Sequence, residues 1–534
     1  MRLRRTTLKG SLSLLPALGG LLWLASCHSG SRSQSPASGE PPGQPLPAMS
    51  QPMSVYTDLD PYLHDLLESQ DVRRIGRYIG AVEPSELSDD LNPTRRKASA
   101  KQELEPIESL FQAGEELFET ELSVVRGFGH AWGPQGPKMH RVHRGAKGGP
   151  DSFSCRSCHH RGGDDGAGEY NENALVGGDG ERVSSALERN PPSLQGAGLL
   201  QILAAEVTAV LQERLSGPLP TEPTQIPLVV QDVDFGYVTR LPDGRVDASA
   251  LRTIDPDLIV KPFGWKGTHS TLRRFSEEAF QVHHGMQSAV LAWQRLSFTT
   301  QPNQASAATR AIMAAFPGGD GLDLDGDGSR IELTDSMLSG IAVYLTLLPL
   351  PVIEPPRAPD LLAAFRQGQA AFQTLGCESC HKPMWLVDKP TWTERGEAQN
   401  TAFRITVDLR KDIRNGPPLR NRDAELPGYP VLLYSDLRRH DMGKELSDPE
   451  PPPGTPKPSI PPSYFLTRPL WGLADSAPYL HDGRAVTIAD AIKGHGGEAA
   501  ESRRKYLALP VESQRALQVF LMSLSRAALP EVSQ

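Results

Sequence analysis

Two segments, Cys155-Arg156-Ser157-Cys158-His159 and Cys377-Glu378-Ser379-Cys380-His381, decide what kind of fold this chain can adopt. Each carries two thiols two residues apart, followed at once by a histidine. Thiols at this spacing reach the two vinyl groups of one haem, while the adjacent imidazole swings under the iron as an axial ligand. We therefore expect two covalently attached c-type haems, with His159 and His381 as iron ligands.

Other uses of these cysteines fit the sequence less well. A zinc site built from all four thiolates would join pairs more than two hundred residues apart, and both pairs are followed by histidine. A disulfide framework is also disfavoured, because the chain has five cysteines and the remaining one, Cys27, has no partner to pair with.

The N-terminus has the features of an export signal. Basic residues precede an apolar run from Ser11 to Ala25, which is too short for a stable membrane span. Leu24-Ala25-Ser26-Cys27 resembles a lipobox, in which Cys27 is acylated and becomes the first mature residue; an ordinary signal peptide with an incidental cysteine is the alternative. We expect a signal peptide at residues 1–26, a disordered tether at 27–54 and a lipid-anchored periplasmic protein whose only membrane contact is the anchor.

Composition excludes one class of partner. The 534 residues carry a net charge of -9, and no strongly basic block follows the N-terminus. Nucleic acid is therefore not expected as a partner.

The two halves of the chain repeat the same features in the same order, which indicates an internal duplication. The repeated residues are Phe111, Gly114 and Phe118 with Phe365, Gly368 and Phe372, then Phe263, Gly267, Thr271 and Leu272 with Tyr479, Gly483, Thr487 and Ile488. A closing helix is expected in each half, and the Pro-rich stretch Pro349–Pro359 separates them. This pattern predicts an all-α fold of two tandem cytochrome c-type domains with long loops, at residues 55–348 and 360–530.

A family resemblance starts from the C-terminal half. The segments Arg468-Pro469-Leu470-Trp471-Gly472 and Ala477-Pro478-Tyr479-Leu480-His481-Asp482-Gly483-Arg484 resemble the bacterial di-haem cytochrome c peroxidase superfamily, which includes the MauG-type enzymes. His495-Gly496-Gly497-Glu498-Ala499 narrows the resemblance to the di-haem oxidoreductase family, whose members are also described as thiol oxidoreductases. It covers roughly residues 105–528, most strongly after Gly368. The resemblance implies haems that face each other, peroxide as oxidant, and a redox donor protein such as a small cytochrome or cupredoxin.

The resemblance also implies roles for single residues. Peroxidases of the superfamily place the distal ligand of the C-terminal haem fourteen positions after the histidine that corresponds to His481, and that position is His495 here. Met442 is the rival ligand, and His495 as a packing residue is the third option. Trp265 corresponds to the tryptophan between the two irons, which makes it a candidate electron relay, with simple packing as the alternative.

In the same comparison, His283 and His284 fall where the peroxidases have an acidic residue beside the open haem. Either histidine could take the acid/base role, because imidazole titrates near neutrality, or could ligate the iron and close the site.

Asp323, Asp325 and Asp327 place carboxylates on alternate residues, as at the start of a calcium loop. The loop pattern would want a glutamate where Thr334 stands. Calcium and a solvated acidic turn both fit this segment.

The function expected from these features is that of a peroxidase-like enzyme that passes electrons from the C-terminal haem to the N-terminal haem. A non-enzymatic electron carrier with two six-coordinate haems is the main alternative. Oxidation of a partner protein, as in MauG-type maturation, ranks last, because those enzymes place tyrosine where His495 stands.

Overall fold

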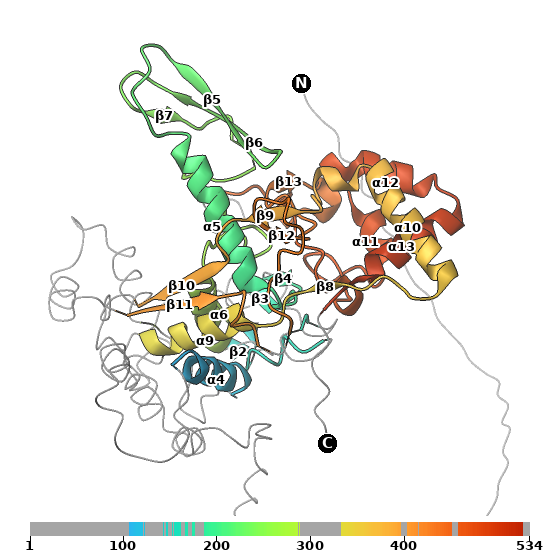
Figure 1. Ribbon diagram of the computed structural model, residues 1–534, viewed down its shortest axis with the longest axis horizontal. Helices are drawn as coiled ribbons and strands as arrows, with labels where there is room; N and C mark the ends of the chain where they lie inside the picture. The colour runs from blue at the N-terminus through green and yellow to red at the C-terminus, as the bar shows by residue number, and fades with distance from the viewer. Residues whose placement is uncertain are drawn as a thin grey trace, which may run out of the picture. The chain divides into compact units, whose positions relative to one another are not determined.

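A pair of packed helices occurs in each half of the chain. Helix α4 (Pro106–Glu119) packs on α9 (Asp335–Leu347), and α10 (Pro359–Thr374) packs on α13 (Val511–Met522) (Figure 1). The helices of each pair lie far apart in sequence, so each pair closes one half on itself.

The repeated glycines explain why these helices pack so closely. A Cβ atom on Gly114 would collide with the carbonyl oxygen of Gly340, and one on Gly368 would collide with that of Ala516. Only a residue without a side chain allows this approach of two backbones. The Phe-Gly-Phe pattern is therefore a helix-crossing pattern used twice.

A second feature repeats before helices α6 (Leu272–His284) and α11 (Ile488–Gly494). In each case an isolated bridge precedes the helix, from Phe263 to His269 and from Tyr479 to Ala485. The side chain of Thr271 then accepts a hydrogen bond from the N–H of Arg274, and the side chain of Thr487 caps α11 in the same way.

The structure is a computed structural model, and the chain divides into two compact units, Met1–Thr57 and Asp58–Gln534. The described residues, all in the second unit, are 106–120, 122, 142–143, 146–147, 152, 154–161, 166–168, 174–176, 186–251, 253–286, 288, 333–396, 403–414, 416–450 and 458–526. Cys27 and the acidic residues Asp323, Asp325 and Asp327 lie outside them, so the lipidation and calcium predictions stay predictions.

The prediction of an all-α fold is wrong, because strands occur throughout the described residues and form seven small sheets. Six sheets have two antiparallel strands: β1 (Val142–His143) with β2 (Ala146–Lys147), β3 (Ala174–Val176) with β4 (Leu187–Arg189), β8 (Val352–Ile353) with β15 (Leu524–Ser525), β9 (Trp385–Val387) with β12 (Tyr429–Val431), β10 (Thr391–Arg395) with β11 (Arg404–Asp408), and β13 (Arg439–Asp441) with β14 (Tyr464–Leu466). The fold is therefore mixed α/β, with helices that carry the repeated patterns and short strands in the connections.

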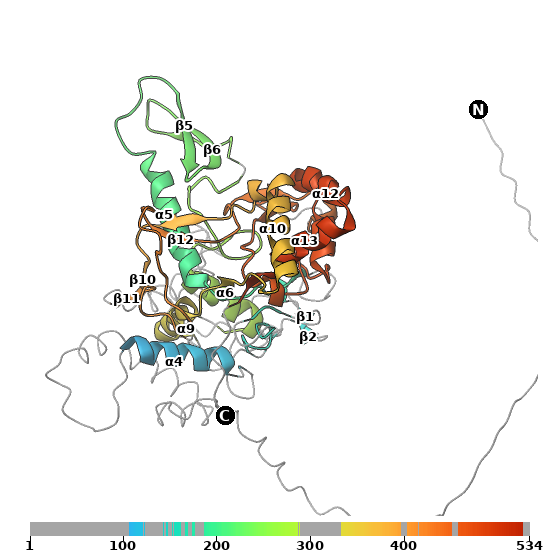
Figure 2. The ribbon, with the colours of Figure 1, turned by 45° about the vertical axis from the view of Figure 1, so that its right-hand side comes forward.

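The largest sheet follows helix α5 (Ala197–Glu213) and has the order β5 (Thr224–Val230), β6 (Val233–Arg240), β7 (Val246–Asp247) (Figure 2). Its register shifts between Pro227 and Val229, where proline has no N–H to give to the ladder. The other strands span only two to five residues. Runs this short show no alternation that separates a strand from a loop, which is why the sequence indicated loops here.

The remaining helices of the described residues are short. They are α12 (Ala500–Leu507) and the 3-10 turns Cys377–Ser379, Lys444–Leu446, Leu473–Asp475 and Gly497–Ala499. Among the described residues, no helix combines the length and the apolar character that crossing a membrane requires.

Candidate functional site

Both Cys-x-x-Cys-His segments form a single tight turn. The N–H of His159 donates to the carbonyl of Cys155 at 3.0 Å, and the N–H of His381 donates to that of Cys377 at 2.9 Å. None of the four cysteines in these segments forms a disulfide. One turn therefore presents two thiols and an imidazole together, as attachment of one haem requires.

The two imidazoles are oriented in the same way. His159 Nδ1 donates to the carbonyl of Pro192 at 3.1 Å, and His381 Nδ1 donates to that of Tyr434 at 3.0 Å. Burial lowers the pKa of each ring to about 4, so both are neutral at physiological pH. A neutral ring whose Nδ1 carries the proton leaves the lone pair of Nε2 available to a metal.

The phenylalanine that ends the repeated pattern packs beside each of these rings. Phe118 and His159 have ring centroids 6.3 Å apart, and Phe372 and His381 have centroids 6.4 Å apart. The helix pairs of the fold thus position both imidazoles.

His495 faces His381. Their ring centroids lie 6.4 Å apart, and His495 Nδ1 donates to the carbonyl of Ala491 at 2.7 Å, which again leaves Nε2 available. Burial also lowers the pKa of His495. A ligating imidazole nitrogen lies about 2 Å from its metal, so two rings on opposite sides of one ion have centroids roughly 6 Å apart. The spacing matches a metal held between them.

Two glycines hold His495 against the segment that carries Met442. A Cβ on Gly496 would lie 2.8 Å from the carbonyl oxygen of Met442, and Gly443 approaches the backbone of Gly497 as closely. Met442 lines the same cavity as His495. Both candidate ligands therefore belong to one wall of the site.

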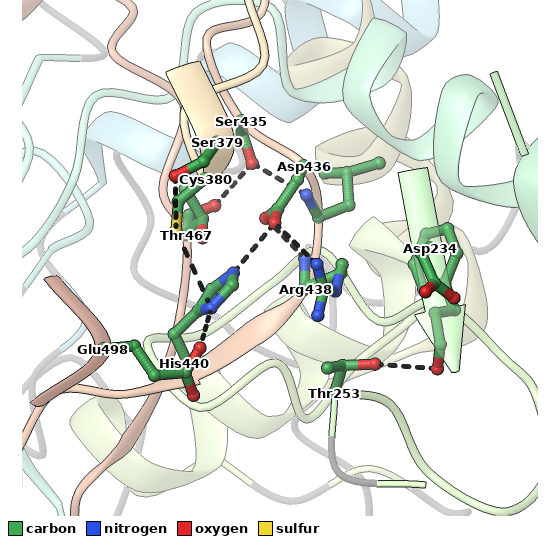
Figure 3. Close-up of polar contacts among 12 residues, drawn as sticks. Asp234, Thr253, Ser379, Cys380, Ser435, Asp436, Arg438, His440, Thr467 and Glu498 are labelled. Carbon is green, nitrogen blue, oxygen red and sulfur yellow. Dashed lines mark hydrogen bonds and ion pairs between the residues drawn. The ribbon is translucent and has the colours of Figure 1, made fainter. Parts of the chain in front are cut away.

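His440 lies on the same wall and contacts two carboxylates (Figure 3). Its Nδ1 lies 2.8 Å from Glu498 Oε2 and its Nε2 lies 2.8 Å from Asp436 Oδ2. Burial disfavours a charged ring, but the hydrogen bond to Asp436 and the neighbouring Cys380 outweigh it and raise the pKa to about 11. The ring is therefore an imidazolium that donates to two carboxylates.

The thiol of Cys380, Asp436 and His440 bring their donor atoms within 4.8 Å of one another, as a metal site would. Both nitrogens of His440 are protonated, however, so neither has a lone pair for an ion. Cys380 is also one of the thiols of the second haem segment. The cluster is better explained as an ion pair of His440 with Asp436 and Glu498 beside the second haem segment.

His495 lies fourteen residues after His481. In the first half, the residue fourteen positions after Trp265, which corresponds to His481 in the repeat, is Ala279. The capped turns before the two helices match, so Ala279 corresponds to His495 in this count, although Ala279 lies within α6 and His495 directly follows α11. Alanine has no group that could ligate a metal. The two halves thus differ at the position where a second axial ligand of a haem iron would be expected.

Three side chains near Ala279 could move protons. Glu278, His283 and His284 all line the cavity. Glu278 Oε2 lies 2.8 Å from His269 Nε2, and its pKa is lowered because this hydrogen bond and charge outweigh burial. His284 Nδ1 donates to the carbonyl of Ser152 at 3.1 Å, while Nε2 lies 3.7 Å from Cys155 Sγ.

Trp265 lies where the two halves meet. Its Nε1 donates to the carbonyl of Asn190 at 2.8 Å, and the N–H of Asn190 donates to the carbonyl of His481 at 2.7 Å. Phe465 stacks on His481 with centroids 4.2 Å apart. The aromatic residues of both halves form one continuous group here.

A buried charge cluster adjoins this aromatic group. Asp448 Oδ2 accepts from Arg189 at 2.8 Å and lies 3.1 Å from Lys266 Nζ. Burial lowers the pKa of Lys266 to about 8 and that of His481 to about 4. His481 is therefore neutral, and the carboxylate of Asp448 pairs with both Arg189 and Lys266.

One cavity of about 1440 Å³ contains both haem segments. Small-molecule sites usually occupy about 300–1,000 Å³, so this volume accommodates more than one such group. The buried hydroxyl of Tyr506 faces it and has no hydrogen-bond partner in the part of the chain that the structure describes. Two attachment segments, three available imidazole nitrogens and this volume together fit two haems.

Sequence reasoning overlooked several of these residues. His440 lies two residues before Met442, but nothing in the sequence pairs it with Glu498. Ala279 could have been found, because the count of fourteen applies equally to the first half. The cluster around Asp448 joins residues too distant in sequence for any spacing rule.

Comparison with known proteins supports the resemblance drawn from the sequence. Residues 411–524 match the family described as "Di-haem oxidoreductase, putative peroxidase". No curated protein sequence matches the chain.

Among solved structures, the diheme peroxidase BthA from Burkholderia thailandensis E264 is 14% identical, with a TM-score of 0.34 over 81% of this chain and 90% of that chain. A MauG-like protein associated with microbial copper homeostasis is 15% identical, with a TM-score of 0.27 over 80% of this chain and 91% of that chain. Hydrazine synthase of Kuenenia stuttgartiensis is 16% identical, with a TM-score of 0.21 over 50% of this chain and 84% of that chain.

Proposed function

We propose that this chain, whose residues 411–524 match the di-haem oxidoreductase family, is a c-type di-haem enzyme that reduces a peroxide with electrons from a donor protein. Haem would supply the one-electron chemistry, because its iron changes oxidation state. The observation that carries the proposal is a difference between the two repeats: one has an imidazole at His495, and the other has Ala279, which cannot bind iron, at the corresponding count.

The C-terminal half is suited to receiving electrons. The rings of His381 and His495 have centroids 6.4 Å apart, and the carbonyls of Tyr434 and Ala491 accept from their Nδ1 atoms, so that each Nε2 stays available. Fixed ligands on both sides allow little rearrangement when the charge changes. Trp265 and His481 lie between this half and the other, as an electron path would require.

The N-terminal half is suited to binding the oxidant. Ala279 leaves space where the other half has a ligand, and His159 keeps an available Nε2. Glu278, His283 and His284 can hold or deliver protons beside that space. Reduction of one hydrogen peroxide to two waters consumes two electrons and two protons, which the donor and these groups would provide.

The position of His284 also supports the alternative of an electron carrier. His284 Nε2 lies 3.7 Å from Cys155 Sγ, on the wall of the cavity that carries the first haem segment. If this nitrogen bound the iron, both haems would be six-coordinate and the protein would only carry electrons.

Electron paramagnetic resonance of the oxidised protein tests the proposal. We expect two covalent haems per chain by pyridine haemochrome assay, one high-spin signal, one low-spin signal and peroxide turnover with a reduced donor. Replacing both Cys377 and Cys380 by Ala should remove the low-spin signal and leave one haem. Two low-spin signals without turnover would instead establish the carrier.

We further propose that the protein is exported and held at the membrane by lipid on Cys27. The apolar run that precedes this cysteine supports the proposal, because it has the length of a signal and not of a span. Haem attachment after export is consistent with this location.

A further inference from the structure

Four charged side chains gather where the two halves meet. Arg189, Lys266, Arg468 and Asp448 all line the cavity. Asp448 already accepts from Arg189 and pairs with Lys266, and the nearby His481 is neutral. These four residues therefore carry one negative charge for three positive ones.

Arg468 is the cation of this group that has no anion. One of its guanidinium nitrogens donates to the carbonyl of Pro262 at 3.1 Å, and its Cζ lies 5.7 Å from the ring centroid of Trp265. No carboxylate pairs with it among the described residues. Burial lowers the pKa of Arg468 to about 10, which still leaves it charged near neutrality.

An unpaired cation on an apolar cavity wall is costly, so such a group usually has a partner that the protein chain does not supply. The guanidinium is planar and presents its N–H donors as a fork, which matches the two oxygens of a carboxylate. Lys266 is less available, because its ammonium also donates to the carbonyls of Pro462 and Tyr464.

We infer that Arg468 binds a propionate carboxylate of a haem at the junction of the two halves. A c-type haem is attached through its vinyl edge, and its propionates leave from the opposite edge, away from the cysteines. Trp265 supports the guanidinium from one side, and the carbonyl of Pro262 orients it from another. The inference deepens the proposed function and requires that haem be bound.

Two consequences follow from this contact. A cation beside a propionate keeps the carboxylate ionised to lower pH, since it favours the charged form. It also favours the reduced iron, because reduction adds negative charge to the haem. Loss of Arg468 should therefore raise the pKa of that propionate and lower the reduction potential of that haem.

Infrared difference spectroscopy of protein with ¹³C-labelled haem propionates tests the inference, together with potentiometric titration of each haem. In the wild type, at least one propionate should stay ionised below the ordinary carboxyl pKa of about 4.3. In Arg468→Gln, that propionate should titrate at least one pH unit higher, and one haem should reduce at a more negative potential. Arg468→Lys should lie between the two, and Arg504→Gln, which removes an exposed arginine paired with Glu501, should behave as the wild type.

A haem-loaded Arg468→Gln with unchanged propionate titration and unchanged potentials would overturn the inference. If that variant does not fold, the wild type decides, because propionates that all titrate in the ordinary range exclude the contact. Haem content is measured first. A chain without covalent haem would instead overturn the proposed function.

Discussion

The indole of Trp265 and the imidazole of His481 face each other edge-on, with ring centroids 6.4 Å apart and an interplanar angle of 71°. The two residues hold the same position in the two repeats, because each lies two residues after the aromatic residue that forms the isolated bridge. The main chain of Asn190 joins them: its carbonyl accepts from Trp265 Nε1, and its N–H donates to the carbonyl of His481. Equivalent turns of the two halves therefore meet directly, with an aromatic residue on each side.

Replacing His495 by Met should raise the reduction potential of one haem and produce the weak sulfur-to-iron charge-transfer band of His/Met cytochromes. The reason is that a thioether favours ferrous iron more than imidazole does. Absorption spectra and a potentiometric titration of wild type and variant measure both effects.

Met442→Ala is the matched control for that experiment. If Met442 is the ligand, the charge-transfer band should already be present in the wild type and disappear in Met442→Ala. His495 would then be a packing residue, and its replacement would leave the spectrum unchanged.

Replacing Ala279 by His should close the N-terminal site, because it places an imidazole at the position that His495 holds in the other half. We expect the high-spin signal to become low-spin and peroxide turnover to fall at least tenfold. Ala279→Val adds bulk without a ligand and should keep the high-spin signal. A high-spin signal that persists in Ala279→His would show that the two positions are not equivalent.

Replacing Gly368 by Ala should destabilise the C-terminal half, because the new Cβ would collide with the carbonyl oxygen of Ala516. Overpacking of this kind costs about 1–3 kcal/mol, which corresponds to a fall of several degrees in thermal midpoint. Differential scanning calorimetry measures the shift. The exposed neighbour Gln369 provides the control, since Gln369→Ala should leave the midpoint nearly unchanged.

His440 should stabilise the fold most strongly at low and neutral pH. Its pKa is raised from an ordinary value of 6.5 to about 11 in the folded protein, because the hydrogen bonds and charges of Asp436 and Cys380 outweigh burial. A raised pKa contributes stability that is complete below pH 6.5 and is lost as the pH rises toward 11, by at most about 1.4 kcal/mol per pH unit. The difference in thermal midpoint between wild type and His440→Gln should therefore shrink from pH 6.5 to 9.

His481 supplies the contrast to that measurement. Its pKa is lowered to about 4, so the ring is neutral in both folded and unfolded chains above pH 6.5. The effect of His481→Gln on the thermal midpoint should stay constant over the same range. A constant effect for His440→Gln as well would show that His440 is not a buried imidazolium.

Replacing Cys27 by Ser should release the protein from membranes into the soluble periplasmic fraction, because the anchor would be lipid and not a membrane span. Fractionation followed by haem staining measures the distribution. A variant that remains firmly in the membrane fraction would contradict the lipobox.

Periodicity and spacing in the sequence were enough to predict the duplication and the attachment segments. Cysteine spacing is a local property, since the thiols and the histidine need only one turn of backbone to meet. The repeated Phe-Gly-Phe pattern is local in the same way, because each glycine marks a close helix crossing wherever its partner helix lies. The family resemblance is likewise carried by contiguous residues, most of them after Arg468.

The class of the fold could not be predicted in this way. Strands such as β9 and β13 span three residues, and their identity depends on a partner elsewhere in the chain, not on their own pattern. Only the tertiary structure decided that these connections pair, and the predicted all-α fold was wrong for that reason.

Long-range electrostatics were also decided by the tertiary structure alone. His440 is charged because its contacts with Asp436 and Cys380 outweigh burial, whereas His481 is neutral because burial prevails over its distant carboxylates. Identical side chains in one sequence thus differ in charge, one cationic and one neutral. The sequence determined which residues are expected to attach haem and where they lie along the chain. The packing of the two halves determined which imidazoles face each other and which cation has no carboxylate partner among the described residues.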